Sequence, residues 1–267
     1  MQVNGAAVHI NGVTTQVNGA PQDERLVVWF DIDNTLYSAS SKISQAMGKR
    51  ILGYFLQMGF DQHEASELHL RYYAQYGLAI RGLVRHHDID PFDFDAKCDG
   101  SLPLEEMIKP DPGLRKLFED IDRTRVRVWA LTNAYRTHAQ RVLRILGIDD
   151  LIEGLVYCDY AQPNFYCKPE KEFYDQALQI AQTTPQKSLF IDDNRANVEA
   201  AKRAGWSRCV HFSEHGLEIV EGGRIREIDN ERLDGGSGVD AEEDDKLVVV
   251  STLEELRVVW SDIFKKE

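Results

Sequence analysis

The sequence has few cysteines, no long apolar run and no cluster of basic residues. Its four cysteines are spread over 267 residues without a Cys-x-x-Cys pair, which favours reduced thiols over a zinc site or a disulfide framework. No apolar run approaches the roughly 18 residues that span a bilayer. No lysine or arginine precedes Arg25, and no apolar stretch of the signal-peptide kind is present. We therefore expect a cytoplasmic protein, with the nucleus as a second location and no membrane partner.

The charge of the chain is strongly negative and unevenly distributed. Lys and Arg number 31 against 44 Asp and Glu, a formal net charge of −13. Residues 213–246 alone carry 12 acidic and 4 basic side chains, so this segment holds most of the excess. Without a basic cluster, we expect no nucleic-acid polymer as a partner. An anionic small molecule remains compatible, because the local charge of a pocket can oppose the overall field.

Two segments near the beginning of the chain stand out by their composition. Residues 1–24 repeat short pieces rich in Asn and Gly that cannot bury a core, and they predict a disordered leader. Residues 38–108 are helical in pattern, since Ile43, Met47 and Ile51 recur at four-residue spacing. This segment is much longer than the roughly 2–6 residues of an ordinary strand-to-helix loop. We interpret it as an inserted helical cap over the carboxyl end of the first strand.

The rest of the chain, residues 25–37 and 109–267, has the pattern of an α/β domain. Apolar strands that end in polar residues alternate with amphipathic helices, two of which are closed by Gly147 and Gly205. Such alternation predicts a Rossmann-like, doubly wound, mostly parallel sheet. Within this core, residues 213–246 predict a surface insertion or a disordered loop. The expected strands lie near 26–31, 125–131, 154–158, 188–191, 208–212 and 247–250, and the helices near 114–121, 135–146, 169–181, 194–204 and 252–258.

The stretch from Val27 to Tyr37 carries the most specific local signal. Four bulky residues of high strand propensity lead directly into Asp31, and Asp33 follows two residues later. Because i and i+2 side chains share a face of an extended segment, the two carboxylates converge on one small volume. Their repulsion is tolerated where a cation, a shared proton or chemistry requires it. The alternative interpretation is a solvated turn at a strand end, since Asp and Asn are common turn residues.

Polar residues also follow two later strands of the predicted sheet. Thr132 and Asn133 follow one strand, and Asp192 and Asp193 follow another. The carboxyl ends of parallel strands border the ligand crevice of such a sheet, so these residues are expected to meet the first carboxylate pair. Lys168 opens a predicted helix and can point into the same crevice. Three or four carboxylates around one point need a hard divalent cation, and octahedral oxygen coordination suits Mg²⁺.

These residues together predict phosphoryl chemistry. With Mg²⁺, Lys168 and Thr132, the site can hold a phosphoryl group. Asp31 can attack phosphorus, because a carboxylate can act as a covalent nucleophile. Asp33 can protonate the leaving oxygen and later deprotonate water. The metal and Lys168 would neutralise the charge on the equatorial oxygens.

The order of these residues resembles the haloacid dehalogenase-like hydrolase superfamily. The four motifs of that superfamily match, in order, Asp31-Ile32-Asp33-Asn34-Thr35, Leu131-Thr132-Asn133, Lys168 and Ile191-Asp192-Asp193-Asn194. The resemblance covers residues 26–212 and implies a phospho-aspartate intermediate at Asp31 with general acid–base work by Asp33. It also implies Mg²⁺ bound by Asp31, by the backbone carbonyl of Asp33 and by Asp192. For Asp193 it leaves open direct metal binding or action through a metal-bound water or the lysine.

A second resemblance lies mainly in the predicted cap. The segment from Arg71 to Val84 is similar to the corresponding part of the fungal pyrimidine 5′-nucleotidases, as are Ser101-Leu102-Pro103-Leu104 and Tyr157-Cys158-Asp159-Tyr160. This similarity implies hydrolysis of mononucleotides of the UMP and CMP type. Nicotinamide mononucleotide and lysophosphatidate stay open as alternative substrates, because some relatives act on them.

Three residues are candidate substrate contacts. Asn133 directly follows the second motif. Tyr76 is interpreted either as part of the packing of the cap or as a platform for base stacking, which contributes roughly 1–3 kcal/mol per base. Arg81 is either a nucleotide contact or half of an internal salt bridge, and we favour the contact.

Four other functions share part of this pattern. A haloacid dehalogenase needs no acid at the position of Asp33, and a signalling receiver is roughly half as long within the usual range of domain sizes. A phosphomutase differs in its product, and a non-catalytic phospho-ligand binding protein would not turn over p-nitrophenyl phosphate. We therefore predict a Mg²⁺-dependent phosphomonoesterase of the 5′-nucleotidase type, whose partner is a small phosphate monoester. The sequence does not indicate an oligomeric state.

Overall fold

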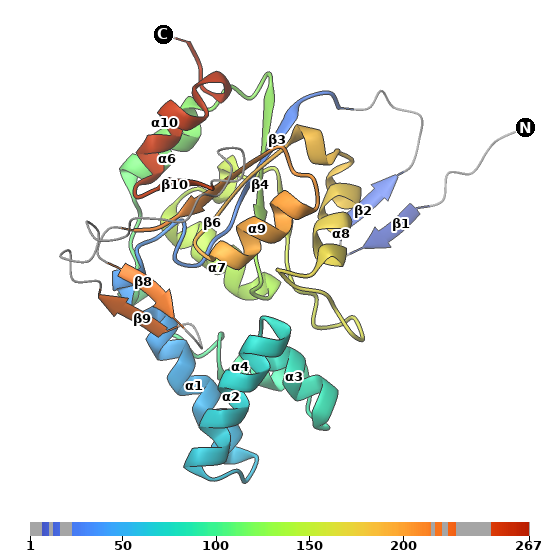
Figure 1. Cartoon of the computed structure of the whole chain (residues 1–267), viewed down its shortest axis with the longest axis vertical. Coiled ribbons are helices and arrows are strands. Elements are labelled where there is room, and N and C mark those ends of the chain that lie inside the picture. The colour runs from blue at the N-terminus through green and yellow to red at the C-terminus, as the bar shows by residue number, and fades with distance from the viewer. Residues whose placement is uncertain are drawn as a thin grey trace, which may run out of the picture.

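The computed structural model of the chain (Figure 1) describes residues 23–214 and 247–266 throughout. It also describes the backbone of four further strands, β1 (Ala7–Ile10), β2 (Val13–Gln16), β8 (Leu217–Val220) and β9 (Arg224–Glu227). β1 pairs antiparallel with β2 inside the predicted disordered leader, and β8 pairs antiparallel with β9 inside the predicted acidic loop. Most of the remainder of both segments lies outside the described residues, so the two predictions stay predictions.

Six parallel strands form the central sheet, in the order β10-β7-β6-β3-β4-β5. They are β3 (Leu26–Phe30), β4 (Val126–Leu131), β5 (Gly154–Val156), β6 (Ser188–Asp192), β7 (Arg208–Phe212) and β10 (Val248–Val250). β3 lies in the middle and pairs with β4 on one side and β6 on the other. The chain winds outwards in both directions from β3, which confirms the predicted doubly wound sheet.

The central strand β3 is apolar on both faces. Trp29 packs against Trp129 and Trp206 on one face, with ring centroids 5.4 Å apart in each pair. Phe30 faces the opposite side, where its ring lies 4.6 Å from that of Phe118. A strand that is covered on both sides reads as a continuous apolar run, as the sequence does here. The first polar residue therefore comes only where the strand leaves the sheet.

Helices cover both faces of the sheet. They are α6 (Pro112–Asp120), α7 (Arg136–Leu146), α8 (Lys171–Ala181), α9 (Arg195–Arg203) and α10 (Leu256–Val259). α6, α7 and α10 pack on the face of Phe30, whereas α8 and α9 pack on the face of Trp29. Gly147, with a φ of 72°, ends α7 in the left-handed conformation, as predicted. The result is a three-layer α/β sandwich.

The predicted start of one helix is wrong. α8 begins at Lys171, with Glu170 as its N-cap, and not at Pro169. Pro169 follows a cis peptide bond and precedes the cap residue. Lys168 therefore does not open a helix but lies in the loop between β5 and α8, from which it reaches the sheet.

The helical insertion predicted between β3 and α6 is present. Four of its helices stand apart from the sheet, below it in Figure 1, namely α1 (Ile43–Gln57), α2 (Gln62–Tyr76), α3 (Ala79–His86) and α4 (Pro91–Lys97). Asp61 caps α2 and forms a capping box with Glu64. The short α5 (Leu104–Met107) packs against α7 and so lies on the core. In the described part of the chain, no helix is both long and apolar enough to cross a membrane.

We expect Gly82→Ala to destabilise the cap. A Cβ at Gly82 would lie only 2.0 Å from Cγ of Tyr72, a buried side chain of α2. Overpacking of this kind typically costs roughly 1–3 kcal/mol, and the free energy of unfolding in urea measures it. Gly53→Ala in α1 is the matched control, since nothing lies within 4 Å of its Cβ. That control should be neutral or stabilising by up to about 1 kcal/mol; equal losses in both variants would contradict the packing of α3 on α2.

Candidate active site

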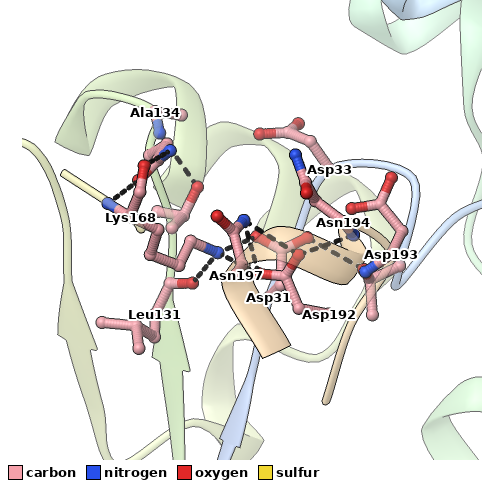
Figure 2. A network of polar contacts seen from close by, with 12 residues as sticks. Asp31, Asp33, Leu131, Ala134, Lys168, Asp192, Asp193, Asn194 and Asn197 are labelled. Carbon is pink, nitrogen blue, oxygen red and sulfur yellow. Dashed lines mark hydrogen bonds and ion pairs between the residues drawn. The ribbon is translucent and has the colours of Figure 1, made fainter. Parts of the chain in front are cut away.

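The predicted site residues meet at the carboxyl ends of three central strands (Figure 2). Asp31 follows β3, Thr132 follows β4 and Asp192 ends β6. β3 pairs directly with both other strands, so the three positions are neighbours along one edge of the sheet. This edge lies at the switch point of the doubly wound topology, where ligands bind in such sheets.

Lys168 ties the three strand ends together. Its Nζ donates to Asp31 Oδ1 and to Asp192 Oδ2, both at 2.6 Å, and to the carbonyl of Leu131 at 2.8 Å. The side chain is only 1% exposed. Burial alone would lower the pKa of Lys168, but the charges of Asp192 and Asp31 raise it above its ordinary value. The ammonium is therefore charged and is shared between two buried carboxylates.

Asn133, in the loop after β4, forms hydrogen bonds with the backbone of Lys168. Asn133 Oδ1 accepts from the backbone amide of Lys168 at 2.7 Å, and Asn133 Nδ2 donates to the carbonyl of Lys168 at 2.9 Å. Asn133 thus has a structural role, and because it also lines the cavity, the predicted substrate contact stays a prediction. Thr132 is buried, and its hydroxyl accepts from the amide of Ala134 at 3.0 Å. Its hydroxyl proton is left to be donated, as the predicted phosphate contact requires.

Asp192 is fixed by several donors besides the lysine. Asn197 Nδ2 lies 3.0 Å from Asp192 Oδ1 and 3.1 Å from Oδ2, and the amide of Asn194 lies 2.8 Å from Oδ1. Figure 2 shows these contacts converging from the start of α9. These donors satisfy the hydrogen-bonding capacity of both carboxylate oxygens, as a fully buried polar group requires.

Three carboxylates form a candidate metal site. Asp31, Asp192 and Asp193 offer oxygens that all lie within 4.8 Å of one another. Burial, helped by the charges of Asp192 and Asp33, raises the pKa of Asp31 to about 7 against the opposing effect of Lys168. Burial and the charges of Asp31 and Asp192 likewise raise the pKa of Asp193 well above its usual range. A hard divalent cation would relieve this repulsion, so the donor set fits the predicted Mg²⁺.

The fourth predicted ligand, Asp33, has a different environment. Its Oδ1 accepts from Tyr37 Oη at 2.7 Å and from His138 Nε2 at 2.8 Å. Its carboxylate is therefore outside the cluster, and only its backbone carbonyl remains for the metal role that the family resemblance implies. Burial would raise the pKa of Asp33, but the charge and hydrogen bond of His138 lower it below its ordinary value. Burial would lower the pKa of His138, yet Asp33 and its acidic neighbours raise it to about 9.

A cavity of about 770 Å³ lies between the cap and these residues. Asp31, Asp33 and Lys168 line its floor, whereas Tyr73 and Tyr76 of α2 line it from the cap. Burial, with a smaller effect of the charges below, raises the pKa of Tyr73 to about 12, so its hydroxyl is neutral. Such a volume falls within the roughly 300–1,000 Å³ of small-molecule sites. Tyr76 thus lies where a substrate contact was predicted, and its role in base stacking stays a prediction.

The substrate contact predicted for Arg81 is wrong. Arg81 is 1% exposed and forms an ion pair with Glu170, with one guanidinium nitrogen 2.9 Å from Oε1. This is the internal salt bridge of the alternative interpretation. The reason is the position of α3, which packs against the loop of Lys168. Cys167 Sγ joins the same loop to the end of α2 by donating to the carbonyl of Tyr76 at 3.0 Å.

Three side chains of the site were not predicted, namely Tyr37, His138 and Asn197. His138 and Asn197 lie on helices that start at the crevice, α7 and α9. Their positions in the sequence could have predicted them. The first turn of a helix that follows a motif lies close to the end of the preceding strand. Polar residues there are candidate partners of the motif residues.

The fold and the site together define a class of protein: Rossmann-like hydrolases with a cap, whose reactive aspartate follows the first strand of the core. The chain belongs to the haloacid dehalogenase-like hydrolase family, whose profile matches residues 26–205. This confirms the family predicted from the four motifs.

Individual relatives agree with this assignment. The chain is 38% identical over 204 residues to Phosphate metabolism protein 8 of Saccharomyces cerevisiae, a match that covers 73% of this chain and 64% of that protein. It is 28% identical over 133 residues to a phosphorylated carbohydrates phosphatase of Thermotoga maritima, covering 49% of this chain and 60% of that one. The matches thus span less than two thirds of either relative. The structure of CbbY from Rhodobacter sphaeroides in complex with phosphate shares the fold, at 20% identity and a TM-score of 0.50, over 70% of this chain and 86% of that one.

We expect Mg²⁺ to stabilise the folded protein. A cation that binds only the native state adds about 2–3 kcal/mol when present at about 100 times its dissociation constant, and thermal unfolding with and without Mg²⁺ measures this. Asp193→Asn should reduce the Mg²⁺-dependent rise in Tm, because it replaces a carboxylate ligand by a neutral amide but leaves both partners of Lys168 in place.

Asp175→Asn is the matched control for this experiment. Asp175 is an exposed carboxylate of α8 that pairs only with Lys171 among the described contacts. Its variant should respond to Mg²⁺ as the parent protein does. A parent protein whose Tm is unaffected by Mg²⁺, or an unchanged response in Asp193→Asn, would contradict the metal assignment.

Proposed function

We propose that this chain is a Mg²⁺-dependent phosphomonoesterase that hydrolyses nucleoside 5′-monophosphates, with preference for the pyrimidine nucleotides UMP and CMP. The observation that carries the proposal is the unlike pair Asp31 and Asp33 on the floor of one cavity. Asp31 lies against Lys168 and the carboxylate cluster, whereas Asp33 lies against Tyr37 and His138. This difference in surroundings supports separate roles for the two carboxylates, with Asp31 meeting the phosphoryl group and Asp33 exchanging a proton.

In the first half of the reaction, an oxygen of Asp31 attacks phosphorus. The new bond joins Asp31 to the phosphoryl group, and the bond from phosphorus to the ester oxygen breaks. The negative charge of the bound phosphate raises the low pKa of Asp33, and the protonated carboxyl then gives its proton to the departing oxygen, so the nucleoside leaves as a neutral alcohol. Thr35 Oγ1 donates to Asp31 Oδ2 at 2.8 Å and orients the nucleophile.

In the second half, water replaces the nucleoside. Asp33, now a carboxylate, takes a proton from the water as its oxygen attacks phosphorus. The acyl phosphate bond breaks, which frees Asp31 and releases inorganic phosphate. Asp33 is protonated again and ready for the next substrate, so protons and bonds balance over the cycle.

Charge on the phosphoryl oxygens is met by Lys168 and by the hydroxyl of Thr132. A Mg²⁺ held by Asp31, Asp192 and Asp193, with the backbone carbonyl of Asp33, would supply the remaining neutralisation when bound. Asn197 and Asn133 support these groups, because they hold Asp192 and the backbone of Lys168 respectively.

The choice of substrate rests on the cap. The cavity offers room for a mononucleotide, and Tyr73 and Tyr76 line it from α2. Aromatic faces stack on bases at roughly 1–3 kcal/mol each. The resemblance of the Arg71–Val84 segment to pyrimidine 5′-nucleotidases supports the same substrate class. A relative named as a phosphatase of phosphorylated carbohydrates supports a small phosphate ester as the broader class.

A panel of phosphate esters tests this proposal. UMP, CMP, AMP, nicotinamide mononucleotide, a hexose phosphate and lysophosphatidate are assayed for phosphate release with Mg²⁺ and with EDTA. We expect release from UMP and CMP in Mg²⁺ and none in EDTA. Faster release from another ester would replace the substrate assignment, and a shifted rather than free phosphate would indicate a mutase.

We expect Asp31→Asn to abolish turnover of every ester in the panel. An amide cannot form the acyl phosphate, so the loss should exceed about a thousandfold, within the range reported when a nucleophile is removed. Asp175→Asn should keep the parent rate, because its carboxylate is exposed on α8. Steady-state phosphate release measures both variants. Activity of Asp31→Asn near that of the control would rule out Asp31 as the nucleophile.

A further inference from the structure

The proton-transferring carboxylate Asp33 stands on a turn rather than on a regular element. It follows β3 by three residues, and the next residue, Asn34, has a φ of 61°, in the left-handed region. Its side chain is 31% exposed towards the cavity, so packing alone does not fix it. A carboxylate that must hand a proton to a leaving group needs a defined orientation, since misplacement by about 1 Å can cost about a hundredfold in rate.

Two hydrogen bonds supply that orientation, and both end on the same oxygen. Tyr37 Oη and His138 Nε2 lie 2.7 Å and 2.8 Å from Asp33 Oδ1. Oδ2 takes part in neither bond and is therefore the oxygen that can meet the ester oxygen of a substrate in the cavity that Asp33 lines. Tyr37 belongs to the same turn as Asp33, so among the described contacts it is His138 that ties the carboxylate to a separate, rigid element.

His138 is itself rigidly held. It lies in the first turn of α7, and its side chain is 2% exposed. The next residue, Ala139, is packed in the core beneath the sheet, which fixes the helix. Nδ1 of His138 is buried and has no hydrogen-bond partner in the described part of the chain. It lies 3.8 Å from Asp99 Oδ1, in the segment that returns from the cap. The imidazole ring of His138 therefore lies between two carboxylates, that of Asp33 in the core and that of Asp99 next to the cap.

We propose that His138 is a positioning residue for the general acid–base step, which holds Asp33 by Oδ1 so that Oδ2 is presented to the leaving oxygen. This inference rests on the proposed function, because it assigns a partner to the proton-transfer role of Asp33. A merely structural histidine would support folding or the shape of the cavity, and its loss would then slow all substrates alike. A positioning histidine matters most where the leaving group needs a proton.

Two variants of His138, with amide side chains of different length, test whether the hydrogen bond to Asp33 is needed. In His138→Gln the amide nitrogen reaches the place of Nε2 and can still donate to Asp33. In His138→Asn the amide nitrogen reaches only the place of Nδ1, so the bond to Asp33 is lost while polarity is kept. His63→Asn is the control, since His63 lies on α2 with its side chain 82% exposed. Asp33→Asn serves as the reference for complete loss of proton transfer.

The measurement is kcat/KM for a series of para-substituted phenyl phosphates that differ in the basicity of the leaving phenol. For the parent protein we expect a weak dependence on basicity, because Asp33 protonates the leaving oxygen. For His138→Asn we expect a steep one, with about a hundredfold loss for the most basic phenol and less than about threefold for p-nitrophenol, as the size of general acid catalysis implies. In His138→Gln and in the control, kcat/KM should depend on the basicity of the phenol as weakly as in the parent protein. In Asp33→Asn it should depend on it as steeply as in His138→Asn.

Each outcome bears on the inference. An equal fall of His138→Asn across the series, or a steep dependence in His138→Gln, would overturn it while leaving the proposed phosphatase intact. If His138→Asn does not fold, the Gln variant alone still decides, because it must keep the parent dependence. A parent protein that hydrolyses none of the esters would overturn the proposed function and this inference together.

Discussion

The buried ammonium of Lys168 is the interaction on which the site depends. Asp31 and Asp192 end neighbouring parallel strands, so the topology of the sheet forces two carboxylates together in a buried place. Lys168 lies 2.6 Å from each and offsets one of the two charges. Removing one member of such a buried set typically costs about 3–5 kcal/mol, since it leaves an uncompensated charge. The remaining negative charge, increased by Asp193, explains why the same place fits a divalent cation.

The loop that carries Lys168 also joins the core to the cap. Glu170, two residues after the lysine, pairs with Arg81 of α3, and the thiol of Cys167 donates to the end of α2. Gly77, which follows α2, has a φ of 76° and lies so close to this loop that a Cβ would be 2.6 Å from the carbonyl of Lys168. Only glycine fits there. The position of the cap over the cavity and the position of Lys168 are therefore set by the same few contacts.

The two aspartates of the first motif have the same side chain, and their pKa values differ because different groups surround them. Asp31 faces an ammonium and other carboxylates, and burial raises its pKa to about 7. Asp33 faces an imidazolium and a phenol, which lower its pKa. Two identical side chains, two residues apart, thus acquire unlike chemistry because one points to the sheet edge and the other to α7. Paired carboxylates generally acquire separate roles in this way, because different environments shift their pKa values apart.

The sequence by itself determined the sheet and the residues along its edge. Apolar strands that end in Asp31, Thr132 and Asp192 predict convergence, because all parallel strands end at the same edge. The tertiary structure decided the side-chain partners, which lie far apart in the chain: Arg81 and Glu170 are 89 residues apart, and Asp33 and His138 are 105. Local periodicity carries no information on such pairs. The packing of the cap on the loop of Lys168, and of α7 beside the first turn, alone brings them within hydrogen-bond distance.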